Sequence, residues 1–148
     1  MRIYLDLCCF NRPYDDQNQN RIRLETEAKL ILQRKIRDGE CTLVWSSILD
    51  LECSKNPFPE RQLAIMQWRT IAAEIIWADE QVIKMASNFM ELGIGNYDAL
   101  HLASAIHGQA NLFVSTDDRL LKRMRSVNNV LGMLPGEALA FVEKWYEN

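Results

Sequence analysis

Residues 2–16, RIYLDLCCFNRPYDD, place a carboxylate inside an apolar, β-prone run that then breaks into a polar segment. A buried carboxylate without a partner is costly, so Asp6 should either end its strand or meet a cation. We interpret residues 2–7 as the first strand and the residues up to about Asn20 as a loop. The rest of the chain must then show what Asp6 faces.

Beyond this stretch, apolar segments alternate between the periods of strands and helices. Strand-like runs follow at 41–45, 74–79, 111–118 and 127–133. Helical spacing or end signals mark 21–37, a short segment carrying Glu52 after Ser46-Ser47, 60–74, 80–92, 96–107 with Asn96 as N-cap, 119–125, and 138–146. Such alternation predicts a three-layer α/β/α fold, with a five-stranded parallel sheet and helices on both of its faces.

Length and composition favour one domain over residues 1–148. The chain has 148 residues, 48% of them hydrophobic, and contains no repeat or linker. It shows no secretory segment and no run of about 20 apolar residues, so we expect a cytoplasmic protein without a membrane partner. Four cysteines without metal-binding spacing suit reduced thiols in that compartment: Cys8, Cys9, Cys41 and Cys53.

The net charge of −3 argues weakly against binding nucleic acid through a broad basic surface. It does not exclude a nuclease. A cluster of carboxylates that binds divalent cations makes the bare sequence look more acidic than the metal-loaded site would be.

Four acids are expected to converge at one edge of the sheet. In open α/β sheets, ligands bind outside the carboxyl ends of the strands, where the strand order reverses. If the first strand is central and the fourth lies beside it, Asp6 and Asp117 face each other across that crevice. Glu52 follows the second strand, and Asp98 lies in the first turn of the helix before the fourth strand.

Converging carboxylates repel one another unless they share a proton or a cation. Hard oxygen ligands suit Mg²⁺ or Mn²⁺, and these ions suit phosphoryl chemistry, because they lower the pKa of a water and neutralise charge on the phosphate. The four acids therefore predict a metal-dependent phosphodiesterase. Taken singly, Asp98 is also explained by the helix dipole, and Glu52 as a solvated helix acid.

Four segments resemble the acidic motifs of PIN domains, in order and across almost the whole chain: IYLDLCCFNRP (3–13), SSILDLE (46–52), YDALHLASA (97–105) and FVSTDDRLL (113–121). The resemblance implies a five-stranded parallel sheet flanked by helices and a Mg²⁺- or Mn²⁺-dependent ribonuclease with RNA as its substrate. Many small bacterial and archaeal PIN proteins are VapC-type toxins held by an antitoxin. An antitoxin partner and a homodimer are therefore expected here.

Carried over by position, the family's catalytic and metal-binding acids fall on Asp6, Glu52, Asp98 and Asp117. Asp117 is preferred to its neighbour because it directly follows the strand, which leaves Asp118 to begin the next helix. Cys8 stands where the family usually has a small polar residue, a difference expected to remove one minor hydrogen bond near the metal.

Three further residues within these motifs are of interest: His101, Arg12 and Asn11. His101, one turn beyond Asp98, is expected to pack in the core or behind the site, because hard Mg²⁺ prefers oxygen ligands. Arg12 and Asn11 are candidate substrate-binding residues, because their loop emerges beside the proposed metal.

The amphipathic segments 21–37 and 60–74 could form an apolar groove for a protein partner.

Other classes of protein fit the pattern less well. A receiver-type signalling domain would need a lysine in the fifth strand, and NNVLGML (128–134) has none. A haloacid-dehalogenase-like phosphatase would need a second Asp where Cys8 stands. The remaining alternative is a catalytically weak PIN-like domain that acts as a protein-binding scaffold, which the presence of all four acids disfavours.

Overall fold

The computed structural model describes residues 1–147 and contains a five-stranded parallel sheet in the order β3-β2-β1-β4-β5. Its strands are β1 (Arg2–Leu5), β2 (Thr42–Ser46), β3 (Glu74–Ile76), β4 (Leu112–Val114) and β5 (Leu131–Met133). β1 is central, and after β3 the chain returns to place β4 on the other side of β1. The strand order therefore reverses between β1 and β4, as the placement of the acids required.

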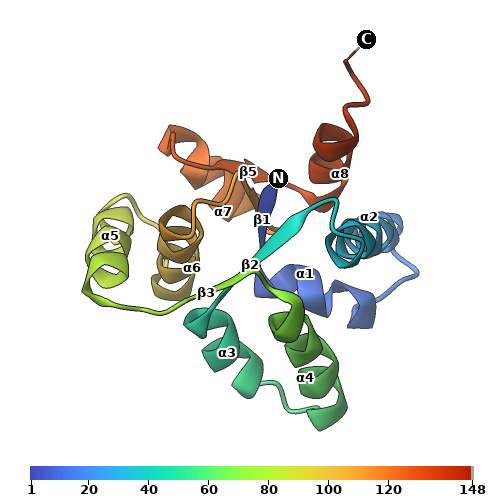
Figure 1. Cartoon of the computed structure of the whole chain (residues 1–148), viewed down its shortest axis with the longest axis horizontal. Coiled ribbons are helices and arrows are strands. Elements are labelled where there is room, and N and C mark those ends of the chain that lie inside the picture. The colour runs from blue at the N-terminus through green and yellow to red at the C-terminus, as the bar shows by residue number, and fades with distance from the viewer. Residues whose placement is uncertain (148) are drawn as a thin grey trace.

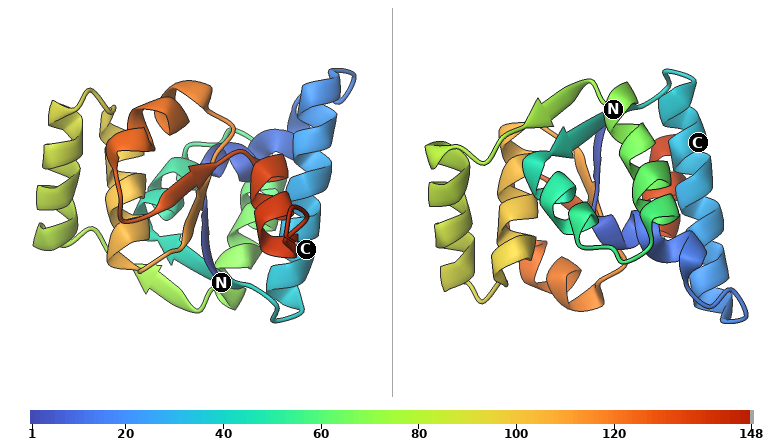
Figure 2. Two further views of the ribbon diagram at one scale, coloured as in Figure 1. Left: turned by 90° about the horizontal axis from the view of Figure 1, so that it is seen from above. Right: turned by 90° about the horizontal axis from the view of Figure 1, so that it is seen from below.

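Helices cover both faces of this sheet, so the predicted three-layer α/β/α fold is confirmed. The helical segments are α1 (Leu7–Asn11), η1 (Arg12–Tyr14), α2 (Asn20–Arg37), α3 (Ser47–Ser54), α4 (Pro59–Met66), η2 (Gln67–Ile71), α5 (Glu80–Glu91), α6 (Asn96–His107), α7 (Asp118–Arg123), η3 (Met124–Ser126) and α8 (Pro135–Glu143). In Figures 1 and 2, α5 and α6 lie on one side of the sheet and α2 and α8 on the other. α5 packs along α6, outside the sheet itself.

Two helix boundaries follow from the local sequence as expected. After α2, Gly39 adopts a φ of +82°, a left-handed conformation that glycine accepts at low cost and that ends the helix. At the start of α3, the Ser46 hydroxyl accepts a hydrogen bond from the Leu49 amide at 3.2 Å. The Ser46 cap fixes where α3, which carries Glu52, leaves the sheet.

The first strand is shorter than the sequence suggested, and the predicted loop after it is partly helical. β1 ends at Leu5, Asp6 caps α1, and the 3₁₀ segment η1 follows directly, so that only residues 15–19 form a loop before α2. The expectation of a loop was wrong for residues 8–14 because a short apolar run does not distinguish a strand from a buried helical turn. Phe10 and Cys9 are buried, so packing against the sheet decides the conformation.

Several other ends also differ from the expected ones. The third strand stops at Ile76, and the fifth begins only at Leu131. Gly95, in an extended conformation, caps α6, and Asn96 is its first helical residue. The closing helix ends at Glu143. Strand length depends on the partners available for pairing, which periodicity alone does not specify.

The predicted helix over residues 60–74 is interrupted: α4 ends at Met66, and the 3₁₀ segment η2 continues to Ile71.

No helix among residues 1–147 is long and apolar enough to cross a membrane. All four cysteines are free thiols, and three of them are buried.

Candidate metal centre

Asp6 lies at the carboxyl end of the central strand, where it caps α1. Its Oδ1 accepts a hydrogen bond from the Leu7 amide at 2.8 Å, and its Oδ2 accepts one from the Ser115 hydroxyl at 3.0 Å. The residue is only 6% exposed. Within residues 1–147, no lysine or arginine forms an ion pair with Asp6. Asp6 therefore ends its strand, and its charge is met by hydrogen-bond donors instead of a basic side chain.

Cys8 supplies a contact that the sequence comparison suggested would be absent. Its thiol donates to Asp6 Oδ2 at 3.5 Å, and its sulfur accepts from the Thr116 amide at 3.3 Å. The expectation of a lost hydrogen bond was wrong, because a thiol is a weak donor and acceptor. These contacts are weaker than those of a hydroxyl group, but they link α1 to the segment that follows β4.

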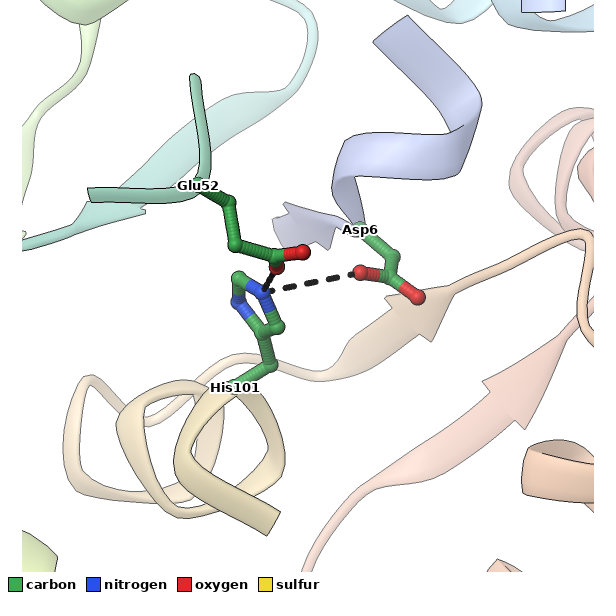
Figure 3. A group of neighbouring side chains, drawn as sticks. All are labelled: Asp6, Glu52 and His101. Carbon is green, nitrogen blue, oxygen red and sulfur yellow. Dashed lines mark hydrogen bonds and ion pairs between the residues drawn. The ribbon is translucent and has the colours of Figure 1, made fainter. Parts of the chain in front are cut away.

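Glu52 and His101 face each other across the site (Figure 3), from α3 and α6 respectively. His101 Nε2 is hydrogen-bonded to Glu52 Oε1 and lies 3.9 Å from Asp6 Oδ1. The histidine is fully buried, as the sequence predicted. Its contact with Glu52 was not anticipated, since a histidine three residues after an acid gives no signal of a partner in another helix.

A chain of buried hydroxyl groups holds the far side of the imidazole. Tyr4 Oη lies 2.5 Å from His101 Nδ1 and 2.6 Å from Ser46 Oγ. Burial raises the pKa of the Tyr4 phenol well above its ordinary value, so it stays protonated. All four groups are satisfied when Ser46 donates to Tyr4, Tyr4 donates to His101 Nδ1, and His101 Nε2–H donates to Glu52.

Asp98, in the first turn of α6, responds to all three other acids. Its pKa is raised to about 6, first by partial burial and then by the negative charges of Asp6 and Asp117, with a smaller contribution from Glu52. His101 acts in the opposite direction. Asp6, Glu52 and Asp117, which come from three other segments, therefore each act electrostatically on Asp98.

Asp117 caps α7 at the carboxyl end of β4. Its Oδ1 accepts from the Arg119 amide at 3.0 Å and from the Leu120 amide at 3.2 Å. The Ser115 hydroxyl accepts from the Asp117 amide at 3.1 Å while donating to Asp6. Fully buried Ser115 thus ties the two strand ends together. Sequence analysis did not single it out as a site residue, although its place just before Asp117 was a usable signal.

Asp118 lies in a different environment from Asp117. Its two carboxylate oxygens accept from the Arg21 guanidinium at 2.8 and 3.0 Å, and this pair lowers the pKa of Asp118. The pair is solvent-exposed. Asp118 begins α7, as expected.

Of the two candidate substrate residues, Arg12 is already paired. Its guanidinium donates to Glu25 Oε1 at 2.7 and 3.0 Å and to Asp15 Oδ2 at 3.2 Å. Glu25 is only 6% exposed, so Arg12 neutralises a buried charge and anchors η1 to α2. Asn11 lines a groove of about 320 Å³ that also contains Glu52.

Two cations that sequence analysis missed line the same groove. Lys55 lies 4.7 Å from the centroid of the Tyr97 ring, and Arg61 lies 4.0 Å from that of Phe58. Within residues 1–147, neither forms an ion pair with a carboxylate. Lys55 caps α3, three residues after Glu52, whereas Arg61 lies on α4 and reaches the groove only because α3 and α4 fold against each other.

The donor set fits a hard divalent cation. One carboxylate oxygen each from Asp6 and Glu52 and one ring nitrogen of His101 lie within 4.8 Å of one another. Because His101 Nε2–H donates to Glu52, the two carboxylates are the candidate ligands, and His101 orients Glu52. Asp98 adds a carboxylate whose raised pKa reports neighbouring negative charge. Carboxylate oxygens with no lysine or arginine partner in the described chain match the ligands that Mg²⁺ and Mn²⁺ take in proteins.

Comparisons with known proteins agree with the fold described above. A family profile described as "PIN domain" matches residues 3–126. A chain of VapBC2 from Rickettsia felis, solved bound to a DNA fragment from its promoter, superimposes with a TM-score of 0.56 and 19% identity, covering 90% of this chain and 98% of that one. A chain of DNA-bound VapBC from Salmonella typhimurium gives 0.53 and 18%, covering 91% and 98%. No curated protein sequence matches.

Proposed function

Because the chain belongs to the PIN-domain family, we propose that it is a metal-dependent endoribonuclease and the toxin of a toxin–antitoxin pair. PIN domains are in general metal-dependent nucleases, and the acids here match that chemistry. The observation that carries the proposal is that one carboxylate oxygen each of Asp6 and Glu52 lie within 4.8 Å of each other, with no lysine or arginine paired to either within the described residues. Such crowding costs stability unless a cation is bound, so it is an arrangement suited to function.

In this proposal Asp6, Glu52, Asp98 and Asp117 hold Mg²⁺ or Mn²⁺. The bound ion would supply positive charge at the scissile phosphate and an acidified water. Asp6 is held by Ser115 and Leu7, and Glu52 is oriented by His101, so both carboxylates are fixed before substrate arrives.

The groove beside Glu52 is the proposed path of the RNA. Lys55 and Arg61 provide charge for backbone phosphates, and Asn11 provides a polar contact at the same place. Arg12 is not assigned this role, because binding a phosphate would remove it from buried Glu25. Glu52 is the one of the four acids that lines the groove, so a strand bound in it would pass the site on the side of Glu52.

An antitoxin partner is proposed by analogy with the two VapBC assemblies, which share the fold at 18–19% identity. A homodimer remains a prediction, and its test is the molar mass of the purified protein in solution. Both proposals are separate from the chemistry of the acids.

Cleavage of RNA by the purified protein tests the function. We expect hydrolysis with Mg²⁺ or Mn²⁺ that stops with EDTA and leaves a 5′-phosphate and a 3′-hydroxyl, read by end-labelling and mass spectrometry. A 2′,3′-cyclic phosphate would show attack by the ribose hydroxyl and would overturn the mechanism. Binding of partners without any cleavage would favour the scaffold alternative.

Two neighbouring acids provide a matched control for this experiment. Asp117→Asn should abolish most of the cleavage, whereas Asp118→Asn should leave it nearly unchanged, because Asp118 is paired with exposed Arg21. Both variants change the charge by the same amount, one residue apart. The reverse ranking would mean that the fourth acid is Asp118.

A further inference from the structure

The wall of the groove beside Glu52 carries two exposed aromatic rings. Phe58, which caps α4, is 50% exposed, and Tyr14, the last residue of η1, is 41% exposed. Both side chains line the same groove as Glu52. α3, which carries Glu52, packs against both α1 and α4 (Figure 1), so the two rings lie on the Glu52 side of the candidate metal centre.

The local structure holds both rings in place. Phe58 stands between two prolines, which restrict the backbone on either side of it, and its amide donates to Asn56 Oδ1 at 3.0 Å. The η1 segment that carries Tyr14 is anchored through Arg12, whose guanidinium donates to buried Glu25 at 2.7 Å. Rings that are fixed before they meet a ligand lose little conformational freedom when it binds.

Arg61 lies against both of these rings. Its guanidinium carbon is 4.0 Å from the centroid of the Phe58 ring and 4.8 Å from that of Tyr14. Within residues 1–147, the Arg61 side chain forms no hydrogen bond or ion pair, so its donors are free for a ligand. A free positive charge beside two aromatic rings suits a ligand that has both a flat π system and negative charge.

Two side-chain amides add polar groups to the same groove. Asn11, the last residue of α1, forms no side-chain hydrogen bond in the described part of the chain. Asn56 uses its Oδ1 to accept from the Phe58 amide, and its Nδ2 has no partner among the described residues. Such amides are able to donate to and accept from the polar edge of a nucleobase.

We propose that this groove is a subsite for one unstacked nucleobase of the RNA, with Phe58 and Tyr14 as its stacking surfaces. The inference rests on the proposed function and deepens it, because it specifies which nucleotide the site accepts. Inside a duplex each base is covered by its neighbours, so only a base that has left the stack reaches Phe58. Lys55 and Arg61, in the same groove, are then available to the adjacent phosphates.

The chemistry of the groove favours a nucleotide over an apolar side chain of a protein. A pocket for an apolar group is lined mainly by apolar residues, whereas most residues that line this groove are polar or charged. Aromatic rings beside basic side chains are typical of surfaces that bind single-stranded nucleic acid. The volume of about 320 Å³ also suits one small ligand and not a run of stacked bases.

An RNA strand that carries a single base tests the proposal. The probe is a short strand in which one nucleotide bears the fluorescent base 2-aminopurine and all others are abasic, and the control strand has no base at all. Both carry the same terminal label, whose anisotropy gives the affinity for the protein in Ca²⁺ or EDTA, and a gel checks that they stay intact. We expect wild type to bind the probe roughly five- to a hundredfold more tightly than the control. It should also quench the aminopurine, because that base stacks on a ring.

Matched variants assign this effect to the rings. Phe58→Leu should lose the preference for the probe and most of the quenching but keep the affinity for the abasic strand, and Tyr14→Leu should lose part of both. Phe141→Leu, the same change at a residue that is 42% exposed on α8, should bind both strands as wild type does. Because the rings are exposed, the melting temperatures should stay close to that of wild type.

Several outcomes would overturn the inference. These are no binding of the probe by wild type, equal affinity for the two strands, or quenching that persists in both Phe58→Leu and Tyr14→Leu. A loss of affinity for the abasic strand in Phe58→Leu would show that the ring only shapes the groove. Unchanged RNA binding by Phe58→Leu, with weaker binding of an antitoxin, would assign the ring to a protein contact instead.

The assay is independent of cleavage. Base-dependent binding without cleavage in Mg²⁺ or Mn²⁺ would leave the inference standing and contradict only the proposed nuclease activity. Cleavage without base-dependent binding would contradict only the inference.

Discussion

The two ends of the sheet differ in whether their charged side chains form ion pairs. At the amino end of the strands, Arg2 donates to Glu74 at 2.7 Å and to the Gly108 carbonyl oxygen at 2.7 and 3.0 Å. At the carboxyl end, Asp6, Glu52, Asp98 and Asp117 gather without a lysine or arginine partner in the described chain. A stable fold favours charges that are paired with opposite charges. The acids at the carboxyl end have no such partner, so we interpret this end of the sheet as the place that binds a cation.

Removing one acid from the unpaired end should have the largest effect. Asp6→Asn keeps the shape of the side chain but removes the charge of a proposed ligand, so we expect cleavage to fall about a thousandfold, equivalent to several kcal/mol of transition-state stabilisation. The same variant should lose the rise in melting temperature that Mg²⁺ or Mn²⁺ gives the wild type. Initial rates and thermal melts test both effects. A variant that keeps both would mean that the acids share no ion.

A smaller effect is expected from the hydroxyl chain behind Glu52. Tyr4→Phe removes the donor to His101 Nδ1 while keeping the ring stacked on Phe113 at 5.5 Å. Groups that orient a metal ligand are typically worth about ten- to a hundredfold in affinity or activity, so we expect roughly a tenfold loss of Mn²⁺ affinity. His101→Gln should have a similar effect.

A calorimetric titration with Mn²⁺ measures this affinity directly and independently of catalysis. Tyr146→Phe, at a tyrosine that is 88% exposed, is the matched control and should bind Mn²⁺ as wild type does. Unchanged metal affinity in Tyr4→Phe and His101→Gln would mean that this network only packs the core.

Asp98→Asn should sharpen the contrast between metal-free and metal-loaded protein. Without metal, the variant relieves repulsion and should be as stable as wild type or more so. With Mg²⁺ at a hundredfold excess over Kd, wild type should gain about 2.7 kcal/mol and the variant less, which reverses the ranking. Thermal melts with EDTA and with Mg²⁺ at fixed ionic strength decide this. Destabilisation in both conditions would make Asp98 a structural helix residue.

The same acid predicts the direction of a pH dependence. Because the folded-state pKa of Asp98 is raised from 3.8 to about 6, the metal-free folded protein binds a proton more tightly than the unfolded chain. Its contribution to stability is therefore present at low pH and is lost as the pH rises from about 4 through 6. Asp98→Asn should flatten this part of the stability profile, measured by urea unfolding in EDTA.

The smallest effect is expected at the paired end. Arg2→Met removes an exposed pair whose side chains are 32% and 50% exposed, so it should cost at most about 1 kcal/mol and leave metal binding unchanged. Urea unfolding measures the cost. A loss of metal affinity in Arg2→Met would mean that the two ends of the sheet are coupled, and would contradict the difference drawn between them.

Local patterns in the sequence were enough to predict the layered fold and the segments that carry the acids. Alternating helix and strand periods predicted the parallel sheet, because each period buries one face of its element. An acid at the end of an apolar run, such as Asp6 or Asp117, was recognisable because strands disfavour Asp and parallel strands end at a common edge. Ser46 and Gly39 act through local hydrogen bonds and dihedral angles, so their effects could also be predicted locally.

The partners of these side chains, in contrast, could not be predicted from local patterns. Ser115 reaches Asp6 across 109 residues of sequence, and Tyr4 reaches His101 across 97. The pairing of Arg12 with Glu25 likewise follows from how η1 packs against α2. Periodicity encodes which face of an element is buried, but not which groups lie opposite it. That choice is made by packing and strand order, through contacts between residues far apart in the chain.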